Sequence, residues 1–489
     1  MTAENVAGLL RARRADSGTA RLGLAEEPMT VAQAVDRAAG LARKLLADGL
    51  TPGEPVALVG GNSNRWIAGW MACQLAGLPT ALINPAFPDE LIGEVLHPLA
   101  PRAVLTTDPR PVPPSITERW LLVEETEPPG SGGESPGVDD LPGLRAAPSD
   151  TSAYMLTSGT SGPPKLVAQS HGYFLSLGRY VADVLGLTER DTVLTPLPLF
   201  HVNPLGYAVL GSLASRASCL SLPRFSASLF WTQVREHGVT AAVLHAPPLE
   251  ILKRRTTAAD AAGHSMRVVF YADPAFLQEF DIPLGISVYG STELGGLSHT
   301  HTWRRDDADA PPEGAVHLGG RPRPGLAHRI VDGEIQVRAD GPGVLAEGYV
   351  RPGGVVEPLA HDGWFASGDL GYDDEHGRLV YTGRASDSVR VKGEFVPLGF
   401  VESTFRGIDA ITDLAVWKRP SALVDEELVL FVESDTIPIE AIRDRRAGLP
   451  AFMRPSAVAR IRALPRDSAV GKTRRRQLDV ASAIEVVEL

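Results

Sequence analysis

Residues 154–172, Y-M-L-T-S-G-T-S-G-P-P-K-L-V-A-Q-S-H-G, carry the strongest local signal in the chain. The apolar run Tyr154-Met155-Leu156 predicts the end of a buried strand. Small hydroxyl residues and glycines follow it, and the run closes at Lys165. Glycines let the backbone approach an anion, and short hydroxyls add donors. A Ser/Gly surface turn is the alternative, but the strand before the run and the Pro-Pro-Lys after it favour a polyphosphate-binding loop.

Length and composition indicate a large globular α/β protein. The 489 residues, of which 44% are hydrophobic, suffice for one large domain or two to three smaller ones. Helix-like and strand-like patterns alternate from the N-terminus to residue 123, which predicts a largely parallel sheet covered by helices. We expect an amphipathic helix at the N-terminus, helices over residues 31–49 and 65–76, and strands over 55–59, 80–84, 103–106, 240–245 and 267–271.

Charge and cysteine content argue against several classes of function. A net charge of −12 argues against broad nucleic-acid binding. No apolar run approaches the roughly 20 residues that span a bilayer, and the N-terminus lacks the apolar core of a signal peptide. The two cysteines, Cys73 and Cys219, are too far apart to suggest a disulfide framework or a metal cluster. We therefore expect a cytoplasmic protein without membrane insertion.

Lysine is rare in this chain. Only six of the 47 basic residues are lysines, and three of them, Lys165, Lys392 and Lys472, fall inside motifs. A lysine retained against such a bias is a candidate for chemistry that a guanidinium cannot perform.

The run T-S-G-T-S-G-P-P-K at residues 157–165 resembles the phosphate loop of the adenylate-forming superfamily, which includes acyl-CoA synthetases, peptide-synthetase adenylation domains and luciferases. It departs from that pattern at Leu166, where those enzymes usually have glycine. The family's other motifs follow in order, so the likeness covers nearly the whole chain. It implies a large N-terminal α/β domain of several subdomains over residues 1–385, holding ATP and the acyl pocket. A small mobile α+β domain over residues 386–489 would carry the catalytic lysine.

A second motif, Y-G-S-T-E, occupies residues 289–293. Tyr289 offers a flat face for adenine, Thr292 a donor for the α-phosphate, and Glu293 a hard carboxylate for Mg²⁺. A strand-to-helix turn with an acid at the helix start is the alternative, but the match to the family's Y-G-x-T-E favours function. The resemblance further implies that Asp369 binds the ribose hydroxyls and Arg384 the ribose and phosphates. The nucleotide-binding set is therefore Thr157, Ser158, Gly159, Thr160, Ser161, Gly162, Lys165, Tyr289, Asp369 and Arg384.

The resemblance also locates an acyl pocket. Adenylation domains for α-amino acids typically carry aspartate where His201 stands, because an unpaired ammonium is costly to bury. We therefore expect a carboxylic acid without an α-amine, although a core histidine is the other interpretation of His201. Residues 271–274 read Y-A-D-P where relatives tend to have G-G-x-P, so Tyr271 and Asp273 are candidates for altering the pocket. The predicted pocket residues are His201, Val202, Tyr271, Gly290 and Gly295.

The C-terminal part contains the third motif, which ends in G-K-T at residues 471–473. A P-loop is rejected because Arg466 stands where that motif needs glycine. The stretch resembles the family's catalytic loop, which makes Lys472 catalytic together with Glu293 and Thr292, Glu293 being the metal ligand. Ser386 replaces the usual hinge Asp or Lys. Phe395 and Phe400 stand where an arginine and an acid are common, on the side associated with the thiol half-reaction.

These motifs predict an acid-activating ligase that uses ATP, Mg²⁺ and CoA. The first hypothesis is an acyl-CoA ligase that completes both half-reactions. The second is an enzyme that stops at the adenylate and passes it to a carrier protein or another partner. The third is a nucleotide-binding pseudoenzyme. High arginine and alanine usage suggests a bacterial source, where such ligases often serve natural-product pathways, an inference by analogy only.

Overall fold

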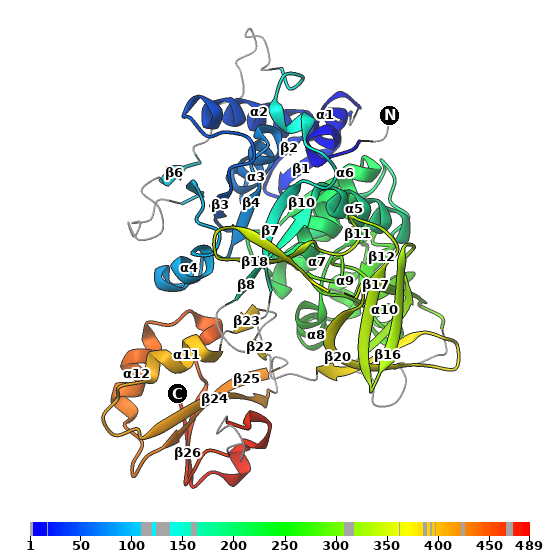
Figure 1. Cartoon of the computed structure of the whole chain (residues 1–489). Helices are drawn as coiled ribbons and strands as arrows, with labels where there is room; N and C mark the ends of the chain where they lie inside the picture. Colours follow the sequence, from blue (N-terminus) through cyan, green and yellow to red (C-terminus); the bar gives the residue numbers. More distant parts are fainter. Residues whose placement is uncertain are drawn as a thin grey trace. The chain divides into compact units, whose positions relative to one another are not determined.

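The computed structural model describes residues 3–16, 18–108, 120–123, 137–157, 164–307, 317–360, 362–384, 389–391, 394–396, 398–421, 426–465 and 473–489 (Figure 1). The described residues form two compact units. The larger unit draws on residues 1–85, 96–157 and 166–383. The smaller unit draws on residues 384–489, together with the short segments 86–95 and 164–165.

The longer sheet of the larger unit joins thirteen of the described strands. Its order is β16 (Leu326–Val331), β17 (Glu334–Ala339), β20 (Phe365–Asp373), β21 (Leu379–Arg384), β15 (His317–Pro322), β14 (His299–Arg304), β13 (Leu284–Tyr289), β12 (Val268–Phe270), β11 (Ala241–Ala242), β9 (Thr192–Thr195), β10 (Ser218–Ser221), β1 (Arg21–Leu24) and β2 (Glu27–Thr30). Pairing is parallel from β1 through β10, β9, β11 and β12 to β13. It becomes antiparallel from β13 to β14 and beyond.

The shorter sheet follows the order β19 (Val355–Pro358), β18 (Gly348–Arg351), β8 (Lys165–Ser170), β7 (Thr151–Thr157), β4 (Thr80–Ile83), β3 (Val56–Val59), β5 (Ala103–Thr106) and β6 (Trp120–Leu122). The strands β7, β4, β3, β5 and β6 pair in parallel. The predicted strands over 55–59, 80–84 and 103–106 are thereby confirmed, and so is the α/β fold class.

Helices pack against these sheets, as Figure 1 shows. They are α1 (Val6–Asp16), α2 (Val31–Ala47), α3 (Asn64–Ala76), α5 (His171–Val184), the π-helix η2 (Asn203–Leu210), α6 (Gly211–Ser215), α7 (Ala227–Glu236), α8 (Ala246–Arg255), α9 (Ala258–Ala261) and α10 (Pro274–Glu279). Helix α4 (Asp89–Leu96) lies almost wholly in a segment of the smaller unit. Helix α3 shows why the local signals worked. Ser63 caps its first turn, Gly77 ends it in the left-handed conformation at φ 71°, and Trp66 and Trp70 bury its apolar face.

The prediction of a strand over residues 240–245 is wrong in its length, because β11 contains only Ala241–Ala242. Pro247 and Pro248 lie in the first turn of α8, and His245 precedes that helix as its N-cap. Proline has no backbone N–H for a sheet ladder but fits the first turn of a helix. The chain therefore leaves the sheet earlier than the apolar run suggests.

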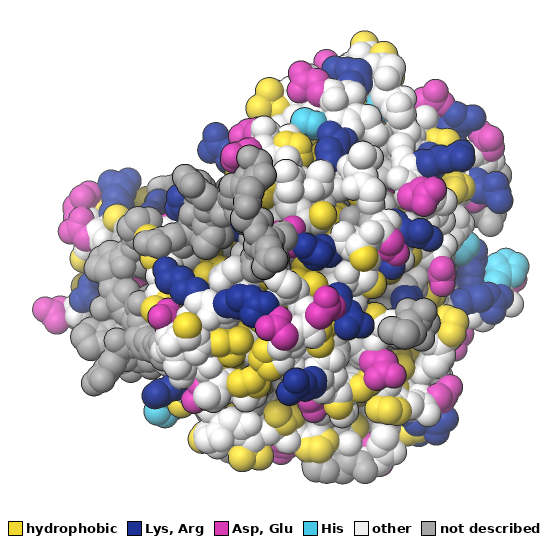
Figure 2. Space-filling model, turned by 90° about the horizontal axis from the view of Figure 1, so that it is seen from above, with side chains coloured by type: hydrophobic (Ala, Val, Ile, Leu, Met, Phe, Trp, Pro, Cys, Tyr) yellow, Lys and Arg dark blue, Asp and Glu magenta, His cyan; other side chains and the backbone are white. Residues whose placement is uncertain are grey.

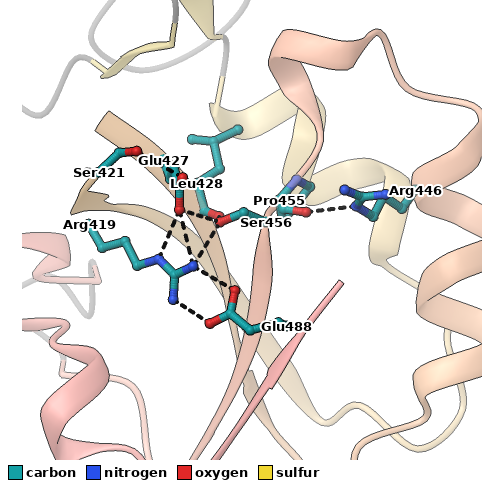
Figure 3. A network of polar contacts seen from close by, with 8 residues as sticks. All are labelled: Arg419, Ser421, Glu427, Leu428, Arg446, Pro455, Ser456 and Glu488. Atoms are coloured by element: carbon teal, nitrogen blue, oxygen red, sulfur yellow. Dashed lines mark hydrogen bonds and ion pairs between the residues drawn. The ribbon is translucent and has the colours of Figure 1, made fainter. Parts of the chain in front are cut away.

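The smaller unit contains a four-stranded sheet of described strands in the order β24 (Asp413–Pro420), β25 (Glu426–Glu433), β26 (Ala457–Ile461) and β27 (Glu485–Glu488). The pair β22 (Val389–Val391) and β23 (Glu394–Val396) and the helices α11 (Leu398–Phe405) and α12 (Ile439–Ala447) accompany it. Arg419 joins its edges (Figure 3), because its guanidinium donates to Glu427 at 3.1 Å and to Glu488 at 2.7 Å. Hydrogen bonding to Arg419 lowers the pKa of Glu488.

Acidic and basic side chains intermingle on the face drawn in Figure 2. On this face, charges of opposite sign lie close together and therefore produce little long-range field. Within the described ranges, no helix combines the length and apolar character needed to cross a membrane.

Candidate active site

The chain turns sharply after β13, the last parallel strand of the longer sheet. The N–H of Gly296 donates to the Ser291 carbonyl at 2.9 Å, and the N–H of Ser298 donates to the Tyr289 carbonyl at 3.0 Å. A Cβ at position 290 would lie 2.3 Å from the Gly296 carbonyl oxygen, so only glycine fits there. The turn, residues 290–296, thus leaves the carboxyl end of a strand, where open α/β sheets bind ligands.

Two buried tyrosines that the sequence analysis did not single out hold this turn. The Tyr173 hydroxyl, from α5, donates to the Thr292 carbonyl at 3.0 Å. The Tyr207 hydroxyl, from η2, donates to the Gly296 carbonyl at 2.7 Å. Burial raises the pKa of both phenols above its usual value, so both stay protonated donors. The turn that carries Thr292 and Glu293 is therefore fixed from the interior of the larger unit.

Glu293 is held by two hydroxyl groups. Ser291 Oγ donates to one carboxylate oxygen at 2.9 Å, and Tyr349 Oη donates to the other at 3.2 Å. An ionised carboxylate has about four lone-pair sites, so these bonds orient the group and leave acceptor capacity. A half-buried, oriented carboxylate of this kind fits a hard divalent cation such as Mg²⁺.

The structure brings Tyr289 and Asp369 together, although 80 positions separate them in sequence. Tyr289 Oη donates to Asp369 Oδ2 at 2.9 Å, and each residue is only 4% exposed. Burial first, and then the negative charge of Asp369, raise the pKa of the Tyr289 phenol well above its usual value. The Tyr289 ring also packs against Tyr381 and His299, with centroids 5.6 and 5.7 Å away. Two residues predicted for adenine and ribose thus form one buried contact beside the turn.

A chain of side-chain hydrogen bonds leads from this pair towards solvent. Ser298 Oγ lies 3.0 Å from His299 Nδ1, and His299 Nε2 lies 3.1 Å from His328 Nδ1. His328 Nε2 lies 2.7 Å from an Asp373 carboxylate oxygen. Burial, and then the neighbouring His328, lower the pKa of His299 to about 3. His299 is therefore neutral at physiological pH.

Among the predicted acyl-pocket residues, Val202 approaches the turn from the N-terminal end of η2. A Cβ built on Gly296 would lie 3.0 Å from Val202 Cγ2 and 2.9 Å from Leu177 Cδ2, so the Val202 side chain lies against the turn. His201 immediately precedes Val202 and packs its ring on Phe200, with centroids 4.7 Å apart. A Cβ at Gly295 would meet the Val344 carbonyl at 2.4 Å. The predicted pocket residues Val202, Gly290 and Gly295 therefore cluster around the turn.

Tyr271 adopts a left-handed backbone conformation with φ 67°, although it is not glycine. This conformation costs a bulky L-residue on the order of 1–2 kcal/mol. Its N–H donates to the Ile286 carbonyl of β13 at 2.7 Å, which fixes the strained residue beside that strand. Glycine adopts this conformation without strain, which fits the glycine that the resemblance predicts at this position. Asp273 instead has a structural contact, since it caps α10 by accepting from Phe276 N at 2.8 Å and pairs with Lys253.

The remaining predicted residues are only partly described. Thr157 ends β7 and is buried, and Lys165 begins β8 with an exposed side chain. Arg384 ends β21, and its side chain lies outside the described residues. Ser158, Gly159, Thr160, Ser161, Gly162 and Lys472 lie outside the described residues as well.

The fold and this turn define the class of protein: the chain belongs to the AMP-binding enzyme family, whose model matches residues 12–351. The predicted enzyme class, AMP-forming acyl-CoA synthetase, is confirmed. A crotonobetaine/carnitine–CoA ligase from Proteus mirabilis (strain HI4320) is 27% identical over 479 residues, which cover 88% of this chain and 89% of that protein.

Two solved structures show the same fold. An o-succinylbenzoate CoA synthetase from Bacillus subtilis superposes with a TM-score of 0.80 at 22% identity, covering 98% of this chain and 99% of that one. An amide bond synthetase from Marinactinospora thermotolerans superposes with a TM-score of 0.76 at 22% identity, covering 96% and 98%. At these identities the likeness establishes the architecture.

Proposed function

We propose that this protein activates a carboxylic acid that lacks an α-amine, in two steps. The substrate carboxylate attacks the α-phosphate of ATP and forms an acyl-adenylate, and pyrophosphate leaves. The CoA thiol then displaces AMP and yields the thioester. The observation that carries the proposal is the buried contact between Tyr289 and Asp369 beside the turn that bears Thr292 and Glu293.

Each residue of this cluster has a role in the first step. Asp369 accepts hydrogen bonds from the ribose hydroxyls, and Tyr289 orients its carboxylate. Among the described residues, no side chain hydrogen-bonds the Thr292 hydroxyl, which is thus available to the α-phosphate. Glu293 would hold Mg²⁺, and the charge of the cation would neutralise phosphate oxygens. The two tyrosine bonds to the turn keep these groups positioned before substrate arrives, and such preorganisation lowers the barrier.

Two sequence motifs that lie wholly or partly outside the described residues complete the proposed machinery. Residues 157–165 bind the pyrophosphate. The proposed role of Lys472 is to offset the repulsion between the attacking carboxylate and the α-phosphate, two anions. A lysine suits this role because a compact ammonium can approach both oxygens at once.

The proposed acceptor is CoA, because the relative from Proteus mirabilis, which matches along most of its length, is a CoA ligase. The proposed acid lacks an α-amine, because His201 stands where amino-acid-activating relatives typically place aspartate. A carrier protein is the second candidate acceptor, since Ser386, Phe395 and Phe400 depart from the family pattern on the side of the thiol half-reaction.

Mass spectrometry of reaction products tests the proposal. The protein is incubated with ATP, Mg²⁺ and a broad panel of carboxylic acids, each with and without CoA. Acyl-CoA formation from one class of acid supports both half-reactions. Acyl-adenylate that persists in the presence of CoA supports adenylation alone, with a separate acceptor. Nucleotide binding without pyrophosphate release for any acid contradicts the proposal and supports a pseudoenzyme.

A further inference from the structure

Arg323 is a buried arginine with incomplete hydrogen bonding. It directly follows β15 and is only 2% exposed. Its Nη2 donates to the Val344 carbonyl at 2.5 Å. Its Nε and Nη1 atoms are buried and have no acceptor among the residues that the structure describes. A guanidinium has five N–H donors, so most of its capacity is unused.

The described residues around Arg323 give it no countercharge. Within the described part of the chain, it forms no ion pair. The groups that act on it electrostatically are the phenols of Tyr173, Tyr180 and Tyr207, which are neutral. The Tyr180 ring lies 6.0 Å from its guanidinium carbon. Burial lowers the pKa of Arg323, but an arginine side chain stays charged at neutral pH. Burying such a charge without a partner costs several kcal/mol.

The guanidinium lies against the turn that bears the candidate catalytic residues. A Cβ at Gly295 would be 2.5 Å from Arg323 Nη2, so only glycine lets the guanidinium reach this backbone. The backbone N–H of Arg323 donates to the Ser298 carbonyl at 2.8 Å, just beyond the turn. Gly296, the next residue of the turn, contacts the side of Val202. Arg323 therefore lies next to the region proposed for the acyl group. It contacts Gly295, which is two residues after Glu293 in the chain.

We propose that Arg323 pairs with a second anionic group, a carboxylate, carried by the acyl substrate. This rests on the proposed function and narrows it to acids with a second negative charge remote from the activated carboxylate. The second carboxylate of the substrate would supply the missing countercharge, and it would accept hydrogen bonds from Nε–H and Nη1–H of Arg323. Arg323 is then a specificity residue that contacts substrate away from the reacting atoms.

The test compares straight-chain dicarboxylic acids with their half-methyl esters, which keep length and shape but lose one charge. Pyrophosphate release is measured with ATP and Mg²⁺ for the wild type, Arg323→Met, Arg323→Lys and Arg321→Met. Arg321 is the matched control, because it is exposed and donates to the His376 carbonyl at the surface. We expect wild type and Arg321→Met to favour the diacid by about 100-fold in kcat/KM. Arg323→Met should lose that preference, and Arg323→Lys should retain part of it.

A binding measurement makes the test independent of turnover and of how well a variant folds. The diacid alone should raise the unfolding midpoint of the wild type more than the half-ester does. Equal shifts and equal kcat/KM for the two acids in the wild type would overturn the role of Arg323. Turnover of half-esters or monoacids alone would overturn it too, and would leave the proposed ligase activity standing. Pyrophosphate release from no acid of any class would count against the ligase activity itself.

Discussion

Arg419 in the smaller unit and Arg323 in the larger unit differ in how their charge is balanced. Arg419 donates from all three guanidinium nitrogens to Glu427, Glu488 and Ser456, at 2.7–3.3 Å (Figure 3). Arg323 is more deeply buried, yet it donates to one carbonyl and has two nitrogens without acceptors among the described residues. Arg323, whose charge costs more free energy to bury, therefore makes fewer hydrogen bonds than Arg419.

This difference separates a structural from a functional use of the same side chain. The hydrogen bonds of Arg419 join β24, β25 and β27, so they stabilise the folded sheet without any ligand. Arg323 by itself contributes little to the stability of the fold. Natural proteins tolerate buried groups with unsatisfied hydrogen bonds mainly at functional sites. The strained Tyr271 and the tightly packed Gly290 and Gly295 lie in the same region of the larger unit. Gly290 and Gly295 belong to the turn at residues 290–296, and Arg323 contacts it.

The largest expected effect is on the rate of adenylate formation, and it compares a lysine of the proposed site with a lysine that has a structural contact. Lys472→Ala should lower the rate of acyl-adenylate formation by about 10²–10³-fold, the scale observed for loss of one transition-state donor. Lys418→Ala removes a lysine that pairs with Glu426 at the surface of β24, and should change the rate by less than about twofold. Single-turnover adenylate formation measures both. A near-wild-type rate for Lys472→Ala would show that the chemistry does not use this lysine.

The second prediction concerns the packing of Arg323 against Gly295. Gly295→Ala should destabilise the larger unit by about 3 kcal/mol, since it adds a clash to an unfavourable backbone angle. Gly295 has φ 80°, and its Cβ would meet both Val344 and Arg323. Gly353→Ala is the matched control, because Gly353 has φ 81° and open space around it. It should cost only about 1 kcal/mol. Urea unfolding compares the two, and equal losses would mean that the contact with Arg323 is unimportant for packing.

The third prediction compares the two arginines directly. Arg419→Met leaves Glu427 and Glu488 without their shared partner, and should destabilise the smaller unit by about 1–3 kcal/mol. Arg323→Met removes a buried unpaired charge, and should leave the unfolding midpoint unchanged or raise it. Hydrogen exchange of the β25 amides and thermal unfolding report on the two sites. A fall in stability for Arg323→Met as large as that for Arg419→Met would make Arg323 a structural residue.

Much of the fold could be predicted because its signals are local. Strands over 55–59, 80–84 and 103–106 and the helix over 65–76 rest on short apolar patterns, with Gly77 as a stop signal. The motif at residues 289–293 also indicated which residue types could handle a nucleotide. The strand over 240–245 was predicted too long because its apolar run continues past the point where two prolines start a helix.

The supports of the site could not be predicted, because they depend on contacts over long distances. Tyr173 and Tyr207 reach the turn from 119 and 89 positions away, and nothing in their local sequence indicates it. Arginine is usually exposed, so the burial of Arg323 gives no signal in the run R-P-R-P-G at residues 321–325. The departure of Tyr271 from a family glycine was visible, but its positive φ became evident only in the structure.

The smallest expected effect concerns His299, whose neutral form is buried beside the turn. Its pKa is about 3 in the folded protein and about 6.5 in an unfolded chain, so the unfolded state binds more protons between these values. Stability then rises with pH across this window and is fully present above about pH 6.5. On acidification from about pH 7.5 to about pH 5, this group should cost about 1–2 kcal/mol. In His299→Gln that part of the pH dependence should vanish, whereas His376→Gln, at an exposed site, should keep it. The free energy of unfolding is measured in urea at each pH for the wild type and both variants. The same dependence on pH for all three proteins would mean that His299 can take up a proton in the folded state and that its burial does not keep it neutral.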